Sequence, residues 1–418
     1  MSWLVVASFY VFRVCCATKV VFRNELVQAL RVDSRRERDR KGCEMLLPDV
    51  GILSGELLHP LKDIREGEKI TGGCGWGETA TTSVSDIFVQ FDHKGPVLTL
   101  KTARGAEVRL SPEHQCFCRL NPLSRHHYLY LMERSTVGFR VGMSQELMKE
   151  LVAMQTAKPD WGNHSEIVDR LWIIESTESL PKALFLQKYA ETKYGLPGFP
   201  FSAKHALCEL TDDLILELFN RIDTPSRARQ LLLDSLMFEE SPHVTFRYSR
   251  SNPAVSTAIQ FVMYGSGERC RTNNFFSHLI RIDGTVELKG AEGKQFKRRV
   301  NKAGLWNMEV SREDLEEAQL FVKTLACLDT LEIVKKIQLS RKNPYYLMPA
   351  SHVKIGMSVP VLDRQGIDDD IVVSVQSEQY QGPLYDLKIE GLNNFVAGGW
   401  VVGAYAGPGK QVPMRDVS

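Results

Sequence analysis

The sequence predicts a mainly β domain that is interrupted by an α/β insert. Short runs rich in β-branched and other apolar residues fill positions 43–120 and return at positions 346–405. The long stretch between them mixes helical periodicity with short apolar runs. A β region that stops and later resumes is typical of one domain into which a second has been inserted.

The composition is that of an ordinary protein with hydrophobic cores. The 418 residues are 43% hydrophobic and 25% charged, and the net charge of +1 favours neither nucleic acid nor membrane as a partner. Nine cysteines are an odd number for a disulfide framework, so we expect a reducing, cytoplasmic location. The apolar run at 3–12 is too short to span a bilayer and has no basic residue before it, so we expect no membrane partner.

The first β region contains two local signals. Residues 60–70 form a short turn-and-strand unit, and residues 97–101 and 107–110 are β-like runs separated by a loop that contains Gly105. We expect the two runs to pair as a hairpin. Ahead of them, residues 31–41 are highly charged and lack apolar periodicity, which is typical of a solvated or disordered segment.

The middle of the chain is expected to contain both strands and helices. Apolar runs predict strands at 128–132, 139–141 and 171–174, and short β-like pieces at 244–309. Helical patterns and capping residues predict helices at 184–194, ended by Gly195 and Pro197, at 211–219, at 228–238, and from a capping box at 311–314 to about Leu328. In the last β region, strands are expected at 371–375, 384–389 and 395–402.

Residues that carry chemistry occur in blocks at the two ends of this β region. Cys43 follows Gly42, residues 60–68 read Pro-Leu-Lys-Asp-Ile-Arg-Glu-Gly-Glu, residues 111–114 read Ser-Pro-Glu-His, and a tail runs from Tyr385-Asp386-Leu387 to Tyr405. In order and spacing, these blocks resemble the nucleophile, histidine and closing blocks of inteins. The resemblance implies a mainly β, Hint-type (hedgehog/intein) horseshoe domain that is interrupted by an α/β (α+β) insert.

The resemblance also implies the layout of domains. Residues 43–124 and 346–405 would be the two halves of the Hint domain, and residues 125–345, here named the insert, would be an endonuclease-like domain. Residues 1–42 and 406–418 would be flanking segments of the host protein, which such a domain acts on within its own chain. We therefore expect a monomer that needs no cofactor for this reaction.

The residue types at the front suit an acyl shift from nitrogen to sulfur. Cysteine is the best side-chain nucleophile near neutral pH, and Cys43 would attack the carbonyl carbon of Gly42. His114 would protonate the leaving nitrogen, because an ordinary histidine pKa lies near the working pH. Ser111 keeps the hydroxyl donor of the family's threonine, and Asp386 matches a family position that tunes the cysteine thiol.

The residues at the back end do not suit the later steps of splicing. By the resemblance, a histidine, an asparagine and a cysteine, serine or threonine should occupy the positions of Gly403, Ala404 and Tyr405. Ala404 has no amide nitrogen to cyclise, Gly403 has no proton donor, and a tyrosine is a poor acyl acceptor. We expect full splicing to be lost, with thioester formation and cleavage at Gly42–Cys43 as the remaining autocatalytic activity.

Two alternatives stay open. Residues 128–142 loosely resemble the GIY-YIG signature of homing nucleases, in which Tyr130 would be the base, Arg140 would stand for the second tyrosine and Glu191 could hold Mg²⁺. The basic cluster at 294–299 could contact a phosphate backbone, so the chain could be a DNA-binding or DNA-cutting protein. It could also be an inert remnant. We expect no other metal site, since the cysteines beside His114 are separated by single residues.

Overall fold

The computed structural model describes residues 44–156, 168–202, 210–245, 258–284, 297–300, 306–329 and 332–405, which belong to one compact unit, Cys43–Tyr405. The charged segment 31–41, the flanking segment 406–418 and the first half of the basic cluster, 294–296, lie outside the described residues. Strands predominate over helices, as the sequence predicts. None of the helices in the described part is long and apolar enough to cross a membrane.

The two β regions form a single hydrogen-bonded network. The first contributes β1 (Gly51–Ser54), β2 (Leu57–Pro60), the 3-10 turn η1 (Leu61–Asp63), β3 (Lys69–Gly75), β4 (Glu78–Thr102), β5 (Glu107–Leu110) and β6 (Gln115–Cys118). The second contributes β16 (Tyr345–Pro349), the 3-10 turn η3 (Ala350–His352), β17 (Ser358–Asp363), β18 (Gly366–Ile389), β19 (Asn394–Ala397) and β20 (Trp400–Gly403). The predicted turn-and-strand unit and the β4–β5 hairpin are both confirmed.

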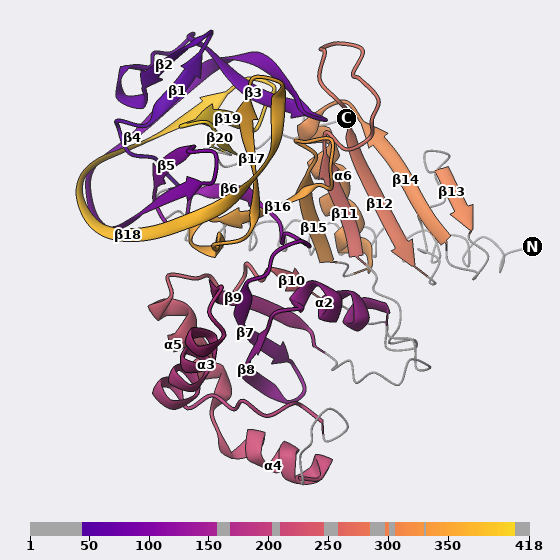
Figure 1. Ribbon diagram of the computed structural model, residues 1–418. Helices are drawn as coiled ribbons and strands as arrows, with labels where there is room; N and C mark the ends of the chain where they lie inside the picture. Colours follow the sequence, from indigo (N-terminus) through magenta and orange to yellow (C-terminus); the bar gives the residue numbers. More distant parts are fainter. Residues whose placement is uncertain are drawn as a thin grey trace, which may run out of the picture. The chain divides into compact units, whose positions relative to one another are not determined.

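The long strands β4 and β18 are the backbone of this region. They pair antiparallel from Thr102 opposite Val372 to Val84 opposite Ile389, and they curve together in Figure 1. The predicted strands 371–375 and 384–389 are therefore one strand, interrupted only by three shifts of register. The prediction of one strand at 395–402 is also wrong, because the structure has two strands there. Gly398 and Gly399, with φ of 58° and 86°, turn the chain back and divide it into β19 and β20.

The first part of the insert has a sheet of its own. The strands β7 (His127–Arg134), β8 (Gly138–Ser144), β9 (Arg170–Thr177) and β10 (Val244–Thr245) run in the order β10-β9-β7-β8, all antiparallel. The helices are α2 (Leu147–Thr156), α3 (Leu180–Tyr194), α4 (Asp212–Arg221) and α5 (Thr224–Asp234). The helix α3 begins at a Ser179 cap and ends at Gly195, whose φ of 65° suits glycine.

The second part of the insert extends the main β network. Its strands are β11 (Ala258–Met263), β12 (His278–Gly284), β13 (Lys297–Val300), β14 (Trp306–Arg312) and β15 (Glu332–Ile337), and β15 pairs with β16. The helix α6 (Leu315–Asp329) packs on β11, β12 and β15. Its cap is Asp314, whose carboxylate accepts from Glu317 N–H at 2.7 Å, so the predicted capping box is wrong. Ser311 instead belongs to β14, because its pairing with Leu279 keeps it in the sheet.

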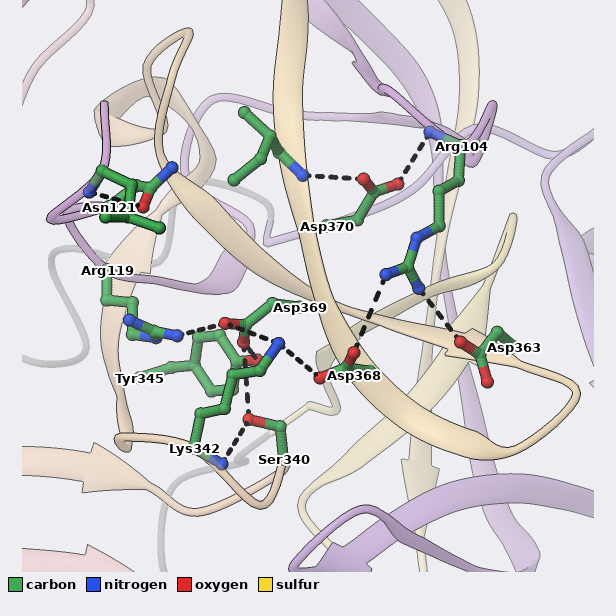
Figure 2. A network of polar contacts seen from close by, with 12 residues as sticks. Arg104, Arg119, Asn121, Ser340, Lys342, Tyr345, Asp363, Asp368, Asp369 and Asp370 are labelled. Atoms are coloured by element: carbon green, nitrogen blue, oxygen red, sulfur yellow. Dashed lines mark hydrogen bonds and ion pairs between the residues drawn. The ribbon is translucent and has the colours of Figure 1, made fainter. Parts of the chain in front are cut away.

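A polar network holds the two β regions and the end of the insert together (Figure 2). Arg104 donates to Asp363 at 3.0 Å, and Lys342 pairs with Asp368 at 2.9 Å. Asp369 accepts from both Arg119 and Tyr345, and only 11% of its side chain is exposed. The network therefore joins the start of β18 to three other places: the loop after β4, the residue after β6 and the start of β16.

Candidate functional site

The chain just after Cys43 is fixed between two strands. Leu46 is fully buried and exchanges backbone hydrogen bonds with Tyr385 of β18, at 2.7 and 2.9 Å. The same residue forms a bridge with Leu110 of β5. Gly42 and Cys43 lie outside the described residues, but the chain three positions after Cys43 is held in the core.

The other end of the unit returns to the same strand. Tyr405 N–H donates to the carbonyl of Leu387 in β18 at 3.0 Å, and the Tyr405 ring lies 3.9 Å from that of Phe88, between ring centroids. Ala404 N–H donates to Asn393 O at 2.9 Å. Tyr385 and Leu387 flank Asp386, so the two ends of the unit are attached to β18 on either side of Asp386.

The loop before β6 carries Ser111 and His114 against the first of these ends. Ser111 N–H donates to Met45 O at 2.8 Å, and Met45 N–H donates to Ser111 Oγ at 3.2 Å. His114 N–H closes the loop on Ser111 O at 3.2 Å. Ser111 thus holds the backbone two residues after Cys43, rather than pointing freely into solvent.

The imidazole of His114 is buried between the two ends. Burial lowers its pKa to about 4, while the backbone groups of Glu44 and Gly403 favour the protonated ring and oppose this shift. Neither ring nitrogen has a hydrogen bond of good geometry among the described residues. Glu44 and Gly403 are the neighbours whose backbone groups interact with the ring. They are the residues beside Cys43 and at the end of β20, respectively.

This environment corrects one expectation from the sequence. An ordinary histidine pKa near the working pH was the reason to expect a ready proton donor at His114. The ring is almost entirely removed from water, so its charged form is disfavoured and the resting imidazole is neutral at pH 7. The rare protonated form is correspondingly a stronger acid than an ordinary imidazolium.

Burial disfavours the charged form of Asp386 as well. Burial raises its pKa well above the usual carboxyl range, the hydrogen bond from Leu387 N–H to Oδ1 at 2.7 Å opposes this, and the charge of Glu44 adds to it. Its Oδ2 is buried and has no hydrogen-bond partner among the described residues. A carboxyl whose neutral form is favoured by burial therefore lies in the core, between the points where the two ends attach to β18.

Gly403 fits its position closely. A Cβ built on it would lie 2.7 Å from Cβ of Gln115 and 2.9 Å from its Cγ. Any larger side chain at position 403, including histidine, needs space that Gln115 now fills. The absence of a histidine at 403 is therefore matched by the packing around it.

The C-terminal hairpin is held by a residue that the sequence analysis did not single out. Asn394 is fully buried, and its side-chain amide accepts from Gly73 N–H at 2.7 Å and donates to Gly73 O at 2.9 Å. A Cβ on Gly73 would lie 2.6 Å from Leu339 Cδ2 and 2.8 Å from Ile367 Cδ1, so a larger residue there would require both side chains to shift. The pair Gly72-Gly73 was the available signal, since glycine in a strand marks close backbone approach.

The described cysteines are poor nucleophiles. Cys74, Cys116, Cys118 and Cys270 are all free and buried. Burial raises the pKa of Cys74 to about 11 and that of Cys118 to about 12, and it raises the pKa of Cys116 further. These thiols stay protonated at neutral pH and act as packing groups.

The three residues considered for a nuclease are placed in the first part of the insert. Tyr130 is 5% exposed in the core, opposite Gly142 in the β7–β8 pair. Arg140 pairs with Met132 two positions along, so it lies on the same face of the sheet as Tyr130. Glu191 lies in α3, where it accepts from Gln187 at 3.0 Å and from Lys188 at 2.6 Å.

The face that carries Tyr130 differs from the face that α3 covers. Tyr130 and Met132 belong to one hydrophobic cluster, whereas Leu129, Leu131 and Ala190 of α3 belong to another. Alternate residues of a strand point to opposite faces, so α3 lies over the face opposite Tyr130. The structure therefore groups Tyr130 with Arg140 and gives Glu191 partners within its own helix.

Comparisons with known proteins add little to this geometry. No protein-family model matches the chain, and a search of curated proteins finds no match. The crystal structure of the Ssp DnaB mini-intein variant M86 is similar at 10% sequence identity, covering 86% of this chain and 93% of that chain, with a TM-score of 0.24. The G-1F mutant of that mini-intein is similar at 10% identity, covering 86% and 98%, with the same TM-score of 0.24. Scores this low carry no argument about the fold.

Proposed function

We propose that this chain is an intein-derived, Hint-type element that cleaves its own backbone at Gly42–Cys43 and no longer splices. The proposal includes the horseshoe fold, the division into residues 1–42, 43–124, 125–345, 346–405 and 406–418, and the roles of Cys43, His114, Ser111 and Asp386. It also includes a cytoplasmic location, where Cys43 stays reduced.

One observation carries the proposal. The buried imidazole of His114 interacts with backbone groups of both Glu44, beside Cys43, and Gly403, at the end of β20. A histidine that serves only packing has no need to lie between the two ends of a domain. An autoprocessing element requires such a group, because it must reach the peptide bond before its first residue.

The proposed reaction is balanced within the chain. Cys43 Sγ attacks the Gly42 carbonyl carbon, a carbon–sulfur bond forms, and the bond from that carbon to Cys43 nitrogen breaks. The thiol proton ends on the new amine, with His114 delivering a proton to the leaving nitrogen. Because burial holds the pKa of His114 near 4, its protonated form is scarce but strongly acidic, which suits a poorly basic amide nitrogen.

The remaining groups around the bond have positioning roles. Ser111 holds Met45 through two hydrogen bonds and so fixes the chain that leads to Cys43. Asp386, whose neutral form is favoured by burial, can in that form donate a hydrogen bond toward the thiol without repelling a thiolate. Neither role needs a metal or a cofactor.

The thioester is then resolved from outside. Water or an external thiol attacks the Gly42 carbonyl carbon, releases residues 1–42 and regenerates the Cys43 thiol. The route to splicing needs side chains that Gly403, Ala404 and Tyr405 lack, and the Tyr405 backbone and ring are held by Leu387 and Phe88.

The test uses the purified 418-residue chain with a strong thiol, followed by intact mass spectrometry. We expect loss of residues 1–42 from the natural chain and no loss from Cys43→Ala. Cys270→Ala is the matched control, because that thiol is buried in the insert, and this variant should cleave as the natural chain does. An intact natural chain, as an inert remnant would give, or equal loss from Cys43→Ala, would rule out the proposal.

A second candidate is DNA cleavage by the insert, which the shared face of Tyr130 and Arg140 favours. Glu191 does not belong to this face, because α3 covers the opposite face of the sheet, so Mg²⁺ would need another ligand. Incubation with supercoiled DNA and Mg²⁺ tests this function, with Tyr130→Phe as the diagnostic variant. Nicking by the natural chain that Tyr130→Phe abolishes would support it, and DNA that stays supercoiled would dismiss it.

A further inference from the structure

The turn η3 supports the loop that carries His114. Ala350 N–H donates to the carbonyl of His114 at 2.9 Å, and Ser351 N–H donates to the carbonyl of Pro112 at 3.1 Å. Both donors come from consecutive residues of a single 3-10 turn. The backbone position of His114 therefore depends on where η3 is held.

The next residue of the same turn is held by the insert. His352 is fully buried, and its Nε2 accepts from Phe238 N–H at 2.9 Å. Its carbonyl accepts from His243 Nε2 at 2.8 Å, and His243 Nδ1 accepts in turn from Ile173 N–H at 2.9 Å. The His352 ring also stacks on the Phe238 ring, with centroids 5.9 Å apart and planes 14° apart.

These contacts require both rings to be neutral. A ring nitrogen that accepts from a backbone N–H cannot carry a proton, so His243 and His352 each have one fixed tautomer. Three adjacent residues, Ala350 to His352, thus hydrogen-bond to the loop that carries His114 and to the insert. This chain of contacts links Ile173, in the centre of the insert's first sheet, to His114.

We propose that His352 is a positioning residue for His114, and that through it the first part of the insert sets the alignment of the self-cleavage site. The inference rests on the proposed cleavage at Gly42–Cys43. It assigns to the insert a role in that reaction which does not depend on DNA.

The surroundings of His243 and His352 disfavour the protonated form of both rings. Burial lowers the pKa of His243 to about 3 and that of His352 well below the usual value, and Lys354 adds to both shifts. Lys354 donates to Ser351 O at 2.8 Å, and its own pKa is lowered by burial to about 8, with Glu175 and Cys118 opposing. The backbone of Ser241 is the remaining group that favours a charged His352.

The experiment compares His352→Ala with His352→Gln and with a matched control, His278→Ala. His278 is likewise a buried histidine with a lowered pKa, but it lies in the insert, and its Nδ1 accepts from Tyr264 N–H at 3.1 Å. Its described hydrogen bonds do not reach the His114 loop. Two readouts are used: the rate of thiol-dependent release of residues 1–42, and the pKa of the His114 ring from NMR of labelled histidine.

We expect release to slow at least tenfold in His352→Ala and the NMR pKa of His114 to move toward 6.5, the usual histidine value. His352→Gln, whose side-chain oxygen can accept from Phe238 N–H, should restore part of the release rate and part of the His114 pKa shift. His278→Ala should change neither the release rate nor the His114 pKa. Unchanged values in His352→Ala, or equal changes in His278→Ala, would overturn the inference. If the natural chain releases nothing, the proposed function fails, and the NMR pKa alone then decides whether His352 positions His114.

A loss of folding in His352→Ala would be recognised by its denaturation curve. His243→Asn is then the variant to use, because asparagine can still accept from Ile173 N–H but cannot reproduce the donor to His352 O. A slower release and a shifted His114 pKa in this folded variant support the coupling. Natural values of both contradict it.

Discussion

The contact between Gly403 and Gln115 gives a prediction that depends on geometry alone. A Cβ at 403 would lie 2.7 Å from Cβ of Gln115, whereas carbon atoms in contact prefer about 3.5–4.0 Å. Gly403 is not among the glycines with positive φ, so alanine there incurs no backbone strain. We therefore expect Gly403→Ala to destabilise the fold by about 1–3 kcal/mol, the usual cost of overpacking.

Substitutions of Gln115 distinguish the steric cost of Gly403→Ala from its other effects. Gln115→Gly removes the Cβ and Cγ contacts, while Gln115→Ala keeps the shorter one at 2.7 Å. In a double-mutant cycle by urea denaturation, the cost of Gly403→Ala should fall by about 1–2 kcal/mol in the Gln115→Gly background and stay nearly unchanged in the Gln115→Ala background. An equal cost in all three backgrounds would refute the steric reasoning. The same logic applies to restoring splicing: Gly403→His with Ala404→Asn and Tyr405→Cys should also need Gln115→Gly.

Three further predictions concern stability, each measured by urea denaturation. His114 has a folded pKa of about 4 against 6.5 unfolded, so its stability contribution is present above pH 6.5 and is lost as the pH falls toward 4. His114→Gln should therefore lose about 2–3 kcal/mol less stability than the natural chain between pH 8 and pH 4.5. The pH dependence of stability has the opposite sign for Asp386, since its raised pKa makes stability fall as the pH rises above the unfolded carboxyl pKa. Asp386→Asn should therefore gain stability relative to the natural chain from pH 4 to pH 7. A stability difference that stays constant with pH would contradict this. Asn394→Ala should cost about 3 kcal/mol, because it leaves buried backbone groups of Gly73 without partners, and a cost below about 1 kcal/mol would contradict the role of that pair.

The local parts of the fold were predictable from the sequence. The β4–β5 hairpin and the helix α3 follow from short-range signals, namely two β-like runs beside Gly105 in the first case and Gly195 with Pro197 in the second. The strand β18 was predicted as two strands because bulges and polar positions at its centre break the pattern. Its continuity comes from pairing with β4, which no local signal encodes.

The sequence was sufficient to predict which residues are candidates for the site, but not the environment of their side chains. The sequence indicates Ser111, His114 and Asp386 as candidates, but it contains nothing that shows how deeply they are buried. The low pKa of His114 and the raised pKa of Asp386 both arise from burial by segments that are distant in the sequence. The supporting residues Gln115 and His352 were missed for the same reason, since their partners are distant or sterically defined.

The most direct measurement of the central claim captures the thioester itself. The purified chain is incubated with a fluorescent peptide that begins with cysteine, which reacts with a thioester and then forms a stable amide bond. We predict that residues 1–42 become attached to the label through Gly42, and that Cys43→Ala gives no labelled product. An unlabelled, intact chain under conditions in which the protein is folded would contradict the account.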